Sequence, residues 1–318
     1  MTPYGHPADR YHCLLDEQPY YLTPPRLLRR DYPGPLIVNP QCWFSWRDPP
    51  LDRFVPPRLD DGYFLHHDCV IWVPDAATGA AWPYWVGPEY LAFLAQFAPG
   101  RPAPVSLSPH IRWVLANADI LVPDDHPARR RSEWLHYRAF RAADFQKGFV
   151  GVPNFIPPFH LGALRRYYRH KVRTGSFQLG DGQVGRRYAA HNEPVAMYVH
   201  EQLTPVVGDI AGTALKPSYA YFVAYQSGSR LERHTDRPQC EYSVTLLIDS
   251  TPEPGEQSPW PIKLDTSRGT VAIWQYLGEA LLYRGRRLPH HRDRLPQGCS
   301  STSLLLHYVD RGFTGPLG

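Results

Sequence analysis

From Ala211 to the end of the chain, short apolar segments alternate with turn sequences, and this pattern constrains the fold more than any other feature. The segments are rich in Val, Ile, Leu, Tyr and Thr, and turns such as QSGS, TSRG and LPQG separate them. Short segments of this composition at regular spacing favour β-strands in a sandwich or barrel. The predicted strands are 218–226, 240–249, 261–266, 270–275, 279–288 and 300–309.

The chain before Ala211 is predicted to mix strands and helices. Strands are expected within 36–46, 63–73, 80–87 and 149–156. Helices are expected at 88–97, 108–118, 132–148 and 157–175, the second starting at Ser108-Pro109. The polar stretch 123–134 is interpreted as a linker or an exposed face. We therefore predict an N-terminal α+β region of unknown role, residues 1–125, and a C-terminal β domain, residues 148–318.

Composition excludes several classes of protein. Hydrophobic residues make up 43% and charged residues 20%, which supports a large core and excludes wholesale disorder. There is no run of 18 uncharged apolar residues, so we expect no membrane partner, and no secretory signal is recognised. Five cysteines without a C-x-x-C pair argue against structural zinc and a disulfide framework, and favour a cytoplasmic location. The arginines are scattered without a binding motif, so we expect no nucleic-acid partner.

His234 and Asp236 form the pattern H-x-D just before an apolar segment. On an extended segment, residues two apart point to one face. A third imidazole, His290 or His291, follows about 55 residues later. Two histidines and one carboxylate with open positions opposite them are the facial triad of non-haem Fe(II) oxygenases. Neutral imidazoles and one carboxylate leave Fe(II) with a net charge of +1, which suits an anionic keto acid.

A second H-x-D pattern, His66 and Asp68, lies early in the chain. No comparable series of predicted strands leads from it to a third ligand. We therefore interpret this copy as surface or satisfied core residues, and assign the metal site to the later copy.

Residues 148–310 resemble the double-stranded β-helix domain of the Fe(II)/2-oxoglutarate-dependent dioxygenases, most closely the prolyl-4-hydroxylase-like subgroup. Tyr225 lies nine residues before His234 with Gly228 between them, which matches the subgroup's Y-x-x-G…H-x-D pattern. The motif GEALLYRGRRLPHHRD is similar to the strand that carries the distal histidine. The resemblance implies a mainly β fold with flanking helices and a jelly-roll, cupin-like core. It also implies Fe(II) and 2-oxoglutarate as cofactors, and a hydrogen bond from Tyr225 to the co-substrate carboxylate.

The sequence departs from the family at one position. The family places an Arg or Lys about ten residues beyond the distal histidine, and this chain has Cys299, Ser300 and Ser301 there. Arg292 is the best substitute, because on a strand it shares the face of His290 and its guanidinium can clamp a carboxylate. Arg230 and Arg237 are weaker candidates for this role. The Pro-His dipeptide favours His290 over His291 as the ligand.

Further residues near these motifs are candidates for substrate binding, and His307 is expected to be a satisfied core histidine. The candidates are Arg187, Asn192, Arg237, Glu241 and Trp274.

The sequence thus predicts an Fe(II)/2-oxoglutarate-dependent dioxygenase. Together with O2 it would hydroxylate a C–H bond of an amino acid, a peptide or a small natural product, releasing succinate and CO2. Two alternatives stay open. One is a non-catalytic β-barrel binding module, and the other is a non-haem iron oxidase of the same fold that does not use 2-oxoglutarate.

Overall fold

The structure is a computed structural model that describes residues 11–15, 19–29, 34–46, 69–86, 90, 93–253 and 257–318. The chain divides into two compact units, residues 1–136 with 156–167, and residues 137–155 with 168–318. The described chain is mainly β, with several antiparallel sheets and four longer helices, which confirms the predicted class. None of its described helices meets the length and hydropathy that a membrane span requires.

The first unit holds a four-stranded sheet in the order β1-β5-β4-β3. Its strands are β1 (Leu14–Leu15), β5 (Ala81–Val86), β4 (Cys69–Pro74) and β3 (Trp43–Trp46), and a separate pair joins β2 (Ile37–Val38) to β6 (Leu121–Val122). Only the β1–β5 pairing is parallel among these. A short 3-10 helix, η2, spans Pro25–Leu27.

Helix α2 (Pro109–Asn117) begins where the sequence predicts. The Ser108 hydroxyl accepts a hydrogen bond from the Ile111 amide, and Pro109 occupies the first turn. The first amides of a helix have no partner within the helix. The Ser108 hydroxyl pairs with one of them, and Pro109 has no amide hydrogen that would need a partner. His66 and Asp68 lie outside the described residues, as do residues 87–89 and 91–92 around the predicted helix 88–97.

Helix α3 (His126–Phe145) confirms the helix predicted at 132–148 but begins earlier. The stretch 123–134 is therefore not a linker, and its exposed residues agree with the alternative interpretation as an exposed face. The helix is one-sided: Trp134 is buried, whereas Arg129 and Glu133 are exposed and form an i,i+4 ion pair at 3.7 Å. The high charge of the exposed side hid the helical period. The next predicted helix is confirmed as α4 (Pro158–Arg173).

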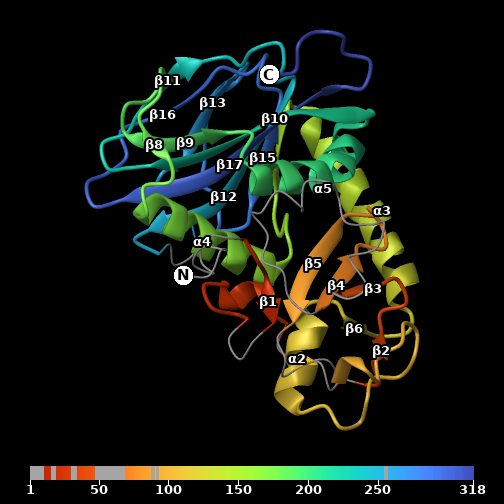
Figure 1. Cartoon of the computed structure of the whole chain (residues 1–318). Helices are drawn as coiled ribbons and strands as arrows, with labels where there is room; N and C mark the ends of the chain where they lie inside the picture. The colour runs from red at the N-terminus through yellow and green to blue at the C-terminus, as the bar shows by residue number, and fades with distance from the viewer. Residues whose placement is uncertain are drawn as a thin grey trace. The chain divides into compact units, whose positions relative to one another are not determined.

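The second unit contains a seven-stranded and a four-stranded sheet, whose strands are labelled in Figure 1 apart from β7 and β14. All their strand pairs are antiparallel. The larger sheet has the order β7 (Phe149–Val152), β15 (Ala280–Tyr283), β12 (Tyr242–Thr251), β17 (Ser300–Asp310), β10 (Leu215–Tyr225), β9 (Arg187–His191) and β8 (Gln178–Leu179). The smaller has the order β11 (Leu231–His234), β16 (His290–Arg292), β13 (Ile262–Thr266) and β14 (Gly269–Ile273).

Helix α5 (Pro194–Ala211) was not predicted. The Glu193 carboxylate accepts a hydrogen bond from the Ala196 amide at 3.0 Å, and Pro194 takes the first helical position. Gly212 ends the helix with a φ of 72°, a left-handed conformation that glycine adopts at little cost. The start and stop signals were therefore present, but Pro205 inside the helix interrupts its pattern.

Strands β10 and β17 present different residues on their two faces. On one face, Phe222 stacks on Tyr168 at 4.3 Å, and Tyr308 packs edge-on against His200 of α5. The other face carries residues of the opposite parity, which line a cavity between the two sheets. Period-two alternation thus separates the helix-covered core from a candidate site.

Candidate metal centre

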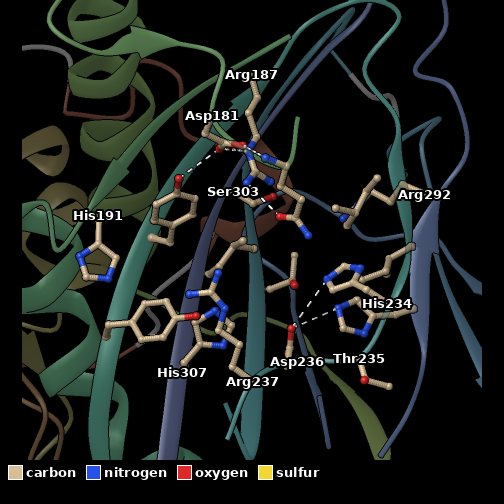
Figure 2. A pocket seen from close by; sticks show the side chains of 18 of the residues that line it. Asp181, Arg187, His191, His234, Thr235, Asp236, Arg237, Arg292, Ser303 and His307 are labelled. Carbon is tan, nitrogen blue, oxygen red and sulfur yellow. Dashed lines mark hydrogen bonds and ion pairs between the residues drawn. The ribbon is translucent and has the colours of Figure 1, made fainter. Parts of the chain in front are cut away.

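Three side chains of this cavity converge, those of His234, Asp236 and His290. Figure 2 labels His234 and Asp236, side by side at one end of the cavity. His234 ends β11 and pairs in register with His290, which begins β16. Asp236 follows in the next turn. Its Oδ1 lies 3.8 Å from His234 Nε2 and 3.6 Å from His290 Nε2, and the two imidazole centroids are 4.3 Å apart. The ligand atoms all lie within 4.8 Å of one another.

Both imidazoles are oriented by the backbone. The Nδ1 of His234 lies 2.8 Å from the Glu232 carbonyl, and that of His290 lies 3.0 Å from the Leu288 carbonyl. A carbonyl only accepts, so each Nδ1 carries the proton and each Nε2 keeps a lone pair. Burial also lowers the pKa of His290, which favours the neutral ring.

Asp236 is fixed from behind. The Ser243 hydroxyl donates to its Oδ2 at 2.6 Å, and its amide donates to the Gly285 carbonyl at 3.0 Å. A Cβ on residue 285 would lie 2.0 Å from Asp236 Oδ2 and 2.5 Å from Ser243 Oγ, so this position requires glycine. One carboxylate oxygen is thus occupied by the protein, and the other faces the imidazoles.

These donors fit a divalent metal ion. In protein metal sites, hydrogen bonds to the non-coordinating atoms orient the ligands. Here backbone carbonyls accept from the Nδ1 of both imidazoles, and the Ser243 hydroxyl donates to the second oxygen of Asp236. The group Asp236, Cys240 and His307 is also compact. It fits less well, because burial raises the pKa of Cys240 to about 12 and keeps the thiol protonated.

The cavity has a volume of about 780 Å³, within the usual range for ligand sites. Both sheets contribute to its lining. The seven-stranded sheet contributes Arg187, His191, Tyr219, Tyr221, Tyr225, Thr245, Tyr283, Ser303, Leu305 and His307, and the four-stranded sheet contributes Leu231, His234, Ile262, His290 and Arg292.

Arg292 is buried in this lining without a carboxylate. Its Nη1 donates to the Trp260 carbonyl at 2.6 Å, and its guanidinium lies 4.6 Å from the Trp260 ring centroid. In the described part of the chain, no Asp or Glu forms an ion pair with it. Burial lowers its pKa, since desolvation disfavours the charged form. A buried, unneutralised guanidinium facing a cavity is suited to an anionic ligand.

Tyr225 lies in contact with a second arginine. Arg187 Nη1 donates to the Tyr225 hydroxyl at 3.1 Å, so the hydroxyl hydrogen stays available to another acceptor. Arg187 Nε donates to Asp181 at 2.6 Å, and Tyr221 donates to the same carboxylate at 3.1 Å. Arg187 was predicted to bind substrate, and it does line the cavity. Its guanidinium N–H groups already donate hydrogen bonds to Tyr225, Asp181 and Gln183.

The remaining predicted residues divide into those that line the cavity and those that do not. Arg237 lines the cavity, whereas Asn192, Glu241, Trp274 and His291 are not among the lining residues. The Asn192 side chain accepts from the Ala220 amide, and Trp274 is 46% exposed.

Three residues around the site were not predicted to belong to it. His307 was expected to be a satisfied core histidine; it is buried, with Nδ1 3.1 Å from Ser243 Oγ, but it also lines the cavity. Ser243 on β12 and Gly285 in the turn after β15 carry no local signal, because only the fold brings them to Asp236.

The sequence matches no protein-family model and no curated protein. Solved structures do resemble the chain. A prolyl-4-hydroxylase of Pseudomonas putida is 19% identical, with a TM-score of 0.44 over 55% of this chain and 100% of that one. The non-heme alpha ketoglutarate dependent carbocyclase SnoK from nogalamycin biosynthesis is 10% identical, with a TM-score of 0.47 over 56% and 86%. HygX of Streptomyces hygroscopicus, with nickel, 2-oxoglutarate and hygromycin B bound, is 13% identical, with a TM-score of 0.44 over 55% and 88%.

Proposed function

We propose that this protein is an Fe(II)/2-oxoglutarate-dependent dioxygenase that hydroxylates a C–H bond of an amino acid, a peptide or a small natural product. The observation that carries the proposal is the convergence of His234, Asp236 and His290, in which both unprotonated Nε2 atoms lie within 3.8 Å of one carboxylate oxygen. Of the two candidate histidines, His290 is the ligand, because His291 does not line the cavity.

The two sheets are interpreted as a double-stranded β-helix. They are antiparallel, they line opposite sides of one cavity, and the three ligands come from the smaller sheet and the turn after β11. In this arrangement a rigid sheet fixes two of the ligands, while the turn supplies the third. Metal geometry is thereby set by backbone pairing rather than by flexible loops.

Bound Fe(II) would supply the activation of O2 and the oxidative decarboxylation of the keto acid to succinate and CO2. The chain's own residues orient the reactants. Arg292 neutralises and grips the distal carboxylate of 2-oxoglutarate, and Tyr225 donates its free hydroxyl hydrogen to the same group. The apolar and aromatic lining excludes bulk water from the reacting groups.

The missing basic residue near Cys299 favours the two alternatives, a binding module or an oxidase that does not use 2-oxoglutarate. The buried Arg292, without a carboxylate partner among the described residues, supports use of the keto acid instead. Arg292 on β16 thus supplies the positive charge that the family places at the start of the next strand, which is β17 here.

Metal analysis and succinate release test the proposal together. The full chain, reconstituted with Fe(II) without oxygen, is expected to bind one metal per chain and to release succinate when 2-oxoglutarate and O2 are added. A protein that binds no metal and releases no succinate would be a binding module. Iron-dependent O2 consumption without succinate would identify an oxidase that does not use 2-oxoglutarate.

A further inference from the structure

The side-chain charges that line the cavity leave one cation over. Among the side chains of the described lining residues there are three arginines, at positions 187, 237 and 292, and two carboxylates, Asp181 and Asp236; Gly318, the last residue of the sequence, also lines the cavity and has no side-chain charge. Arg187 and Asp181 form an ion pair at 2.6 Å and cancel. A divalent metal on two neutral imidazoles and Asp236 has a net charge of +1. Together with Arg292 it balances a dianionic keto acid, so Arg237 remains.

The carboxylates near Arg237 are already engaged. Asp236 is held by Ser243 and faces the imidazoles. Glu241 lies 3.0 Å from Arg286, and 3.9 Å from two further arginines, at positions 284 and 287. The chain around Arg237 therefore holds more positive than negative charge. A field of this sign attracts anions and raises their rate of association.

Two buried polar atoms in the same cavity also lack partners. Neither Gln239 Oε1 nor Ser303 Oγ has a hydrogen-bond partner, and Ser303 is only 1% exposed. Both residues belong to the cavity lining, and Figure 2 labels Ser303 and Arg237 within it. Buried polar atoms without partners are costly, so a ligand that pairs with them gains binding energy. Gln239 Oε1 requires a donor, and lies two residues from the cation.

We infer that the substrate carries a free carboxylate that binds Arg237, and an N–H or O–H group that reaches Gln239. The inference rests on the proposed function, because the charge balance includes the metal and the keto acid. A carboxylate supplies the single negative charge that is missing, whereas a phosphate dianion supplies more. This chemistry selects a free amino acid or N-substituted amino acid, with its own α-carboxylate, over an internal residue of a peptide.

Matched ligands test the inference. The full chain is loaded with Fe(II) without oxygen and saturated with 2-oxoglutarate, so that the co-substrate site is filled and no turnover occurs. Calorimetry then compares N-acetyl amino acids with the corresponding N-acetyl amino acid amides, which resemble internal peptide residues. At least one acid is expected to bind the wild type about tenfold more tightly than its amide, the effect of one charge-assisted hydrogen bond.

Three variants locate the effect. Arg237→Gln is expected to remove the preference for the acid, and Arg237→Lys to keep part of it. Arg268→Gln is the matched control, because Arg268 is exposed in the β13–β14 turn and outside the cavity lining; it is expected to keep all of the preference. The inference is overturned if the wild type does not prefer any acid, including the case where nothing binds. It is also overturned if the preference survives in Arg237→Gln.

The co-substrate provides the remaining check. If Arg237→Gln raises the 2-oxoglutarate requirement as much as Arg292→Met does, Arg237 belongs to the keto-acid site and the inference is wrong. Metal content and succinate release are measured in the same preparations. A wild type that binds no iron and releases no succinate contradicts the proposed function itself. A wild type that does both, without preferring acids, contradicts only the inference about the substrate.

Discussion

The two ends of the cavity use similar residue types in opposite ways. At one end, the Nε2 atoms of His234 and His290 carry no proton, and that of His290 lies 3.4 Å from the Tyr283 hydroxyl. Arg292, at the same end, keeps an unneutralised charge. At the other end, both oxygens of Asp181 are occupied. Its Oδ1 accepts two backbone amides, at 2.9 and 2.8 Å, and its Oδ2 accepts from Arg187 and Tyr221.

We interpret the end with His234, His290 and Arg292 as a binding site, and the end with Asp181 as a cluster that stabilises the fold. Polar groups that the protein satisfies itself add stability, whereas groups left incomplete cost stability until a ligand arrives. Burial alone does not distinguish the two, because Arg187 and Arg292 are both buried. We therefore expect substitutions at the incomplete end to change ligand binding, and substitutions at the satisfied end to change stability.

His234→Ala is expected to have the largest effect. Removing one of three ligands should abolish Fe(II) binding and succinate release, while the metal-free protein unfolds within about 0.5 kcal/mol of the wild type. Thermal unfolding with and without metal measures both, because a ligand that binds only the folded state raises the melting temperature. His291→Ala is the matched control and should keep the metal-induced shift. Loss of that shift in His291→Ala instead would assign the third ligand to position 291.

Gly285→Ala tests the support behind Asp236. The new Cβ would lie 2.0 Å from Asp236 Oδ2, so the carboxylate must move. We expect metal affinity to fall by about 100-fold, as for other changes behind a metal ligand, and stability to fall by about 1–3 kcal/mol from overpacking. Metal titration and chemical denaturation measure these. Gly312→Ala, where a Cβ meets nothing within 4 Å, should change neither. An unchanged metal affinity in Gly285→Ala would show that the position of Asp236 does not matter.

Arg292→Met should affect the keto acid alone. Losing a charge-assisted clamp is expected to raise the 2-oxoglutarate requirement by about 10- to 100-fold. Stability should not fall by more than about 1 kcal/mol, because an apolar side chain of similar size replaces a buried charge. Steady-state kinetics with varied 2-oxoglutarate measure the first, and denaturation the second. A large loss of stability with an unchanged 2-oxoglutarate requirement would show that Arg292 stabilises the fold and does not bind the keto acid.

The sequence predicted the residues whose role depends on local pattern. The H-x-D turn, the His290 strand and the alternation that puts Arg292 beside His290 are periodic features, and the structure brings these side chains to one cavity. Long strands such as β10, β12 and β17 were predicted for the same reason. Short β11 was not, because a strand of four residues shows too few alternations.

What the sequence did not predict depends on tertiary contacts. Ser243 on β12 and Gly285 in the turn after β15 meet Asp236 only in the folded chain, so nothing near them in the sequence marks their role. Closeness in sequence also misled. Glu241, predicted to bind substrate, lies five residues beyond Asp236 but pairs with Arg286 outside the cavity lining. Trp274 follows the edge strand β14 and is exposed to solvent.

The smallest expected effect lies at the satisfied end of the cavity. Asp181→Asn should lower stability by about 1–3 kcal/mol at neutral pH, because hydrogen bonds to a charged group are lost. Burial by itself would raise the pKa of Asp181. The hydrogen bonds from Arg187 and from the Val184 and Gln183 amides outweigh burial, and its pKa is lowered. Its stabilising contribution is therefore complete above the unfolded-state value of about 3.9, and is lost as pH falls through the lower folded-state value.

Denaturation of the wild type and Asp181→Asn at neutral and acidic pH measures this contribution. The difference in unfolding free energy should be constant near neutrality and shrink in acid, where the wild-type carboxylate becomes protonated. Metal binding should stay intact, since no metal ligand contacts Asp181 in the described structure. If Asp181→Asn instead abolishes metal binding and leaves the unfolding free energy unchanged, the contrast between the two ends of the cavity is wrong. The Asp181 cluster would then have to be assigned to ligand binding as well, because its full set of hydrogen bonds would not have contributed stability.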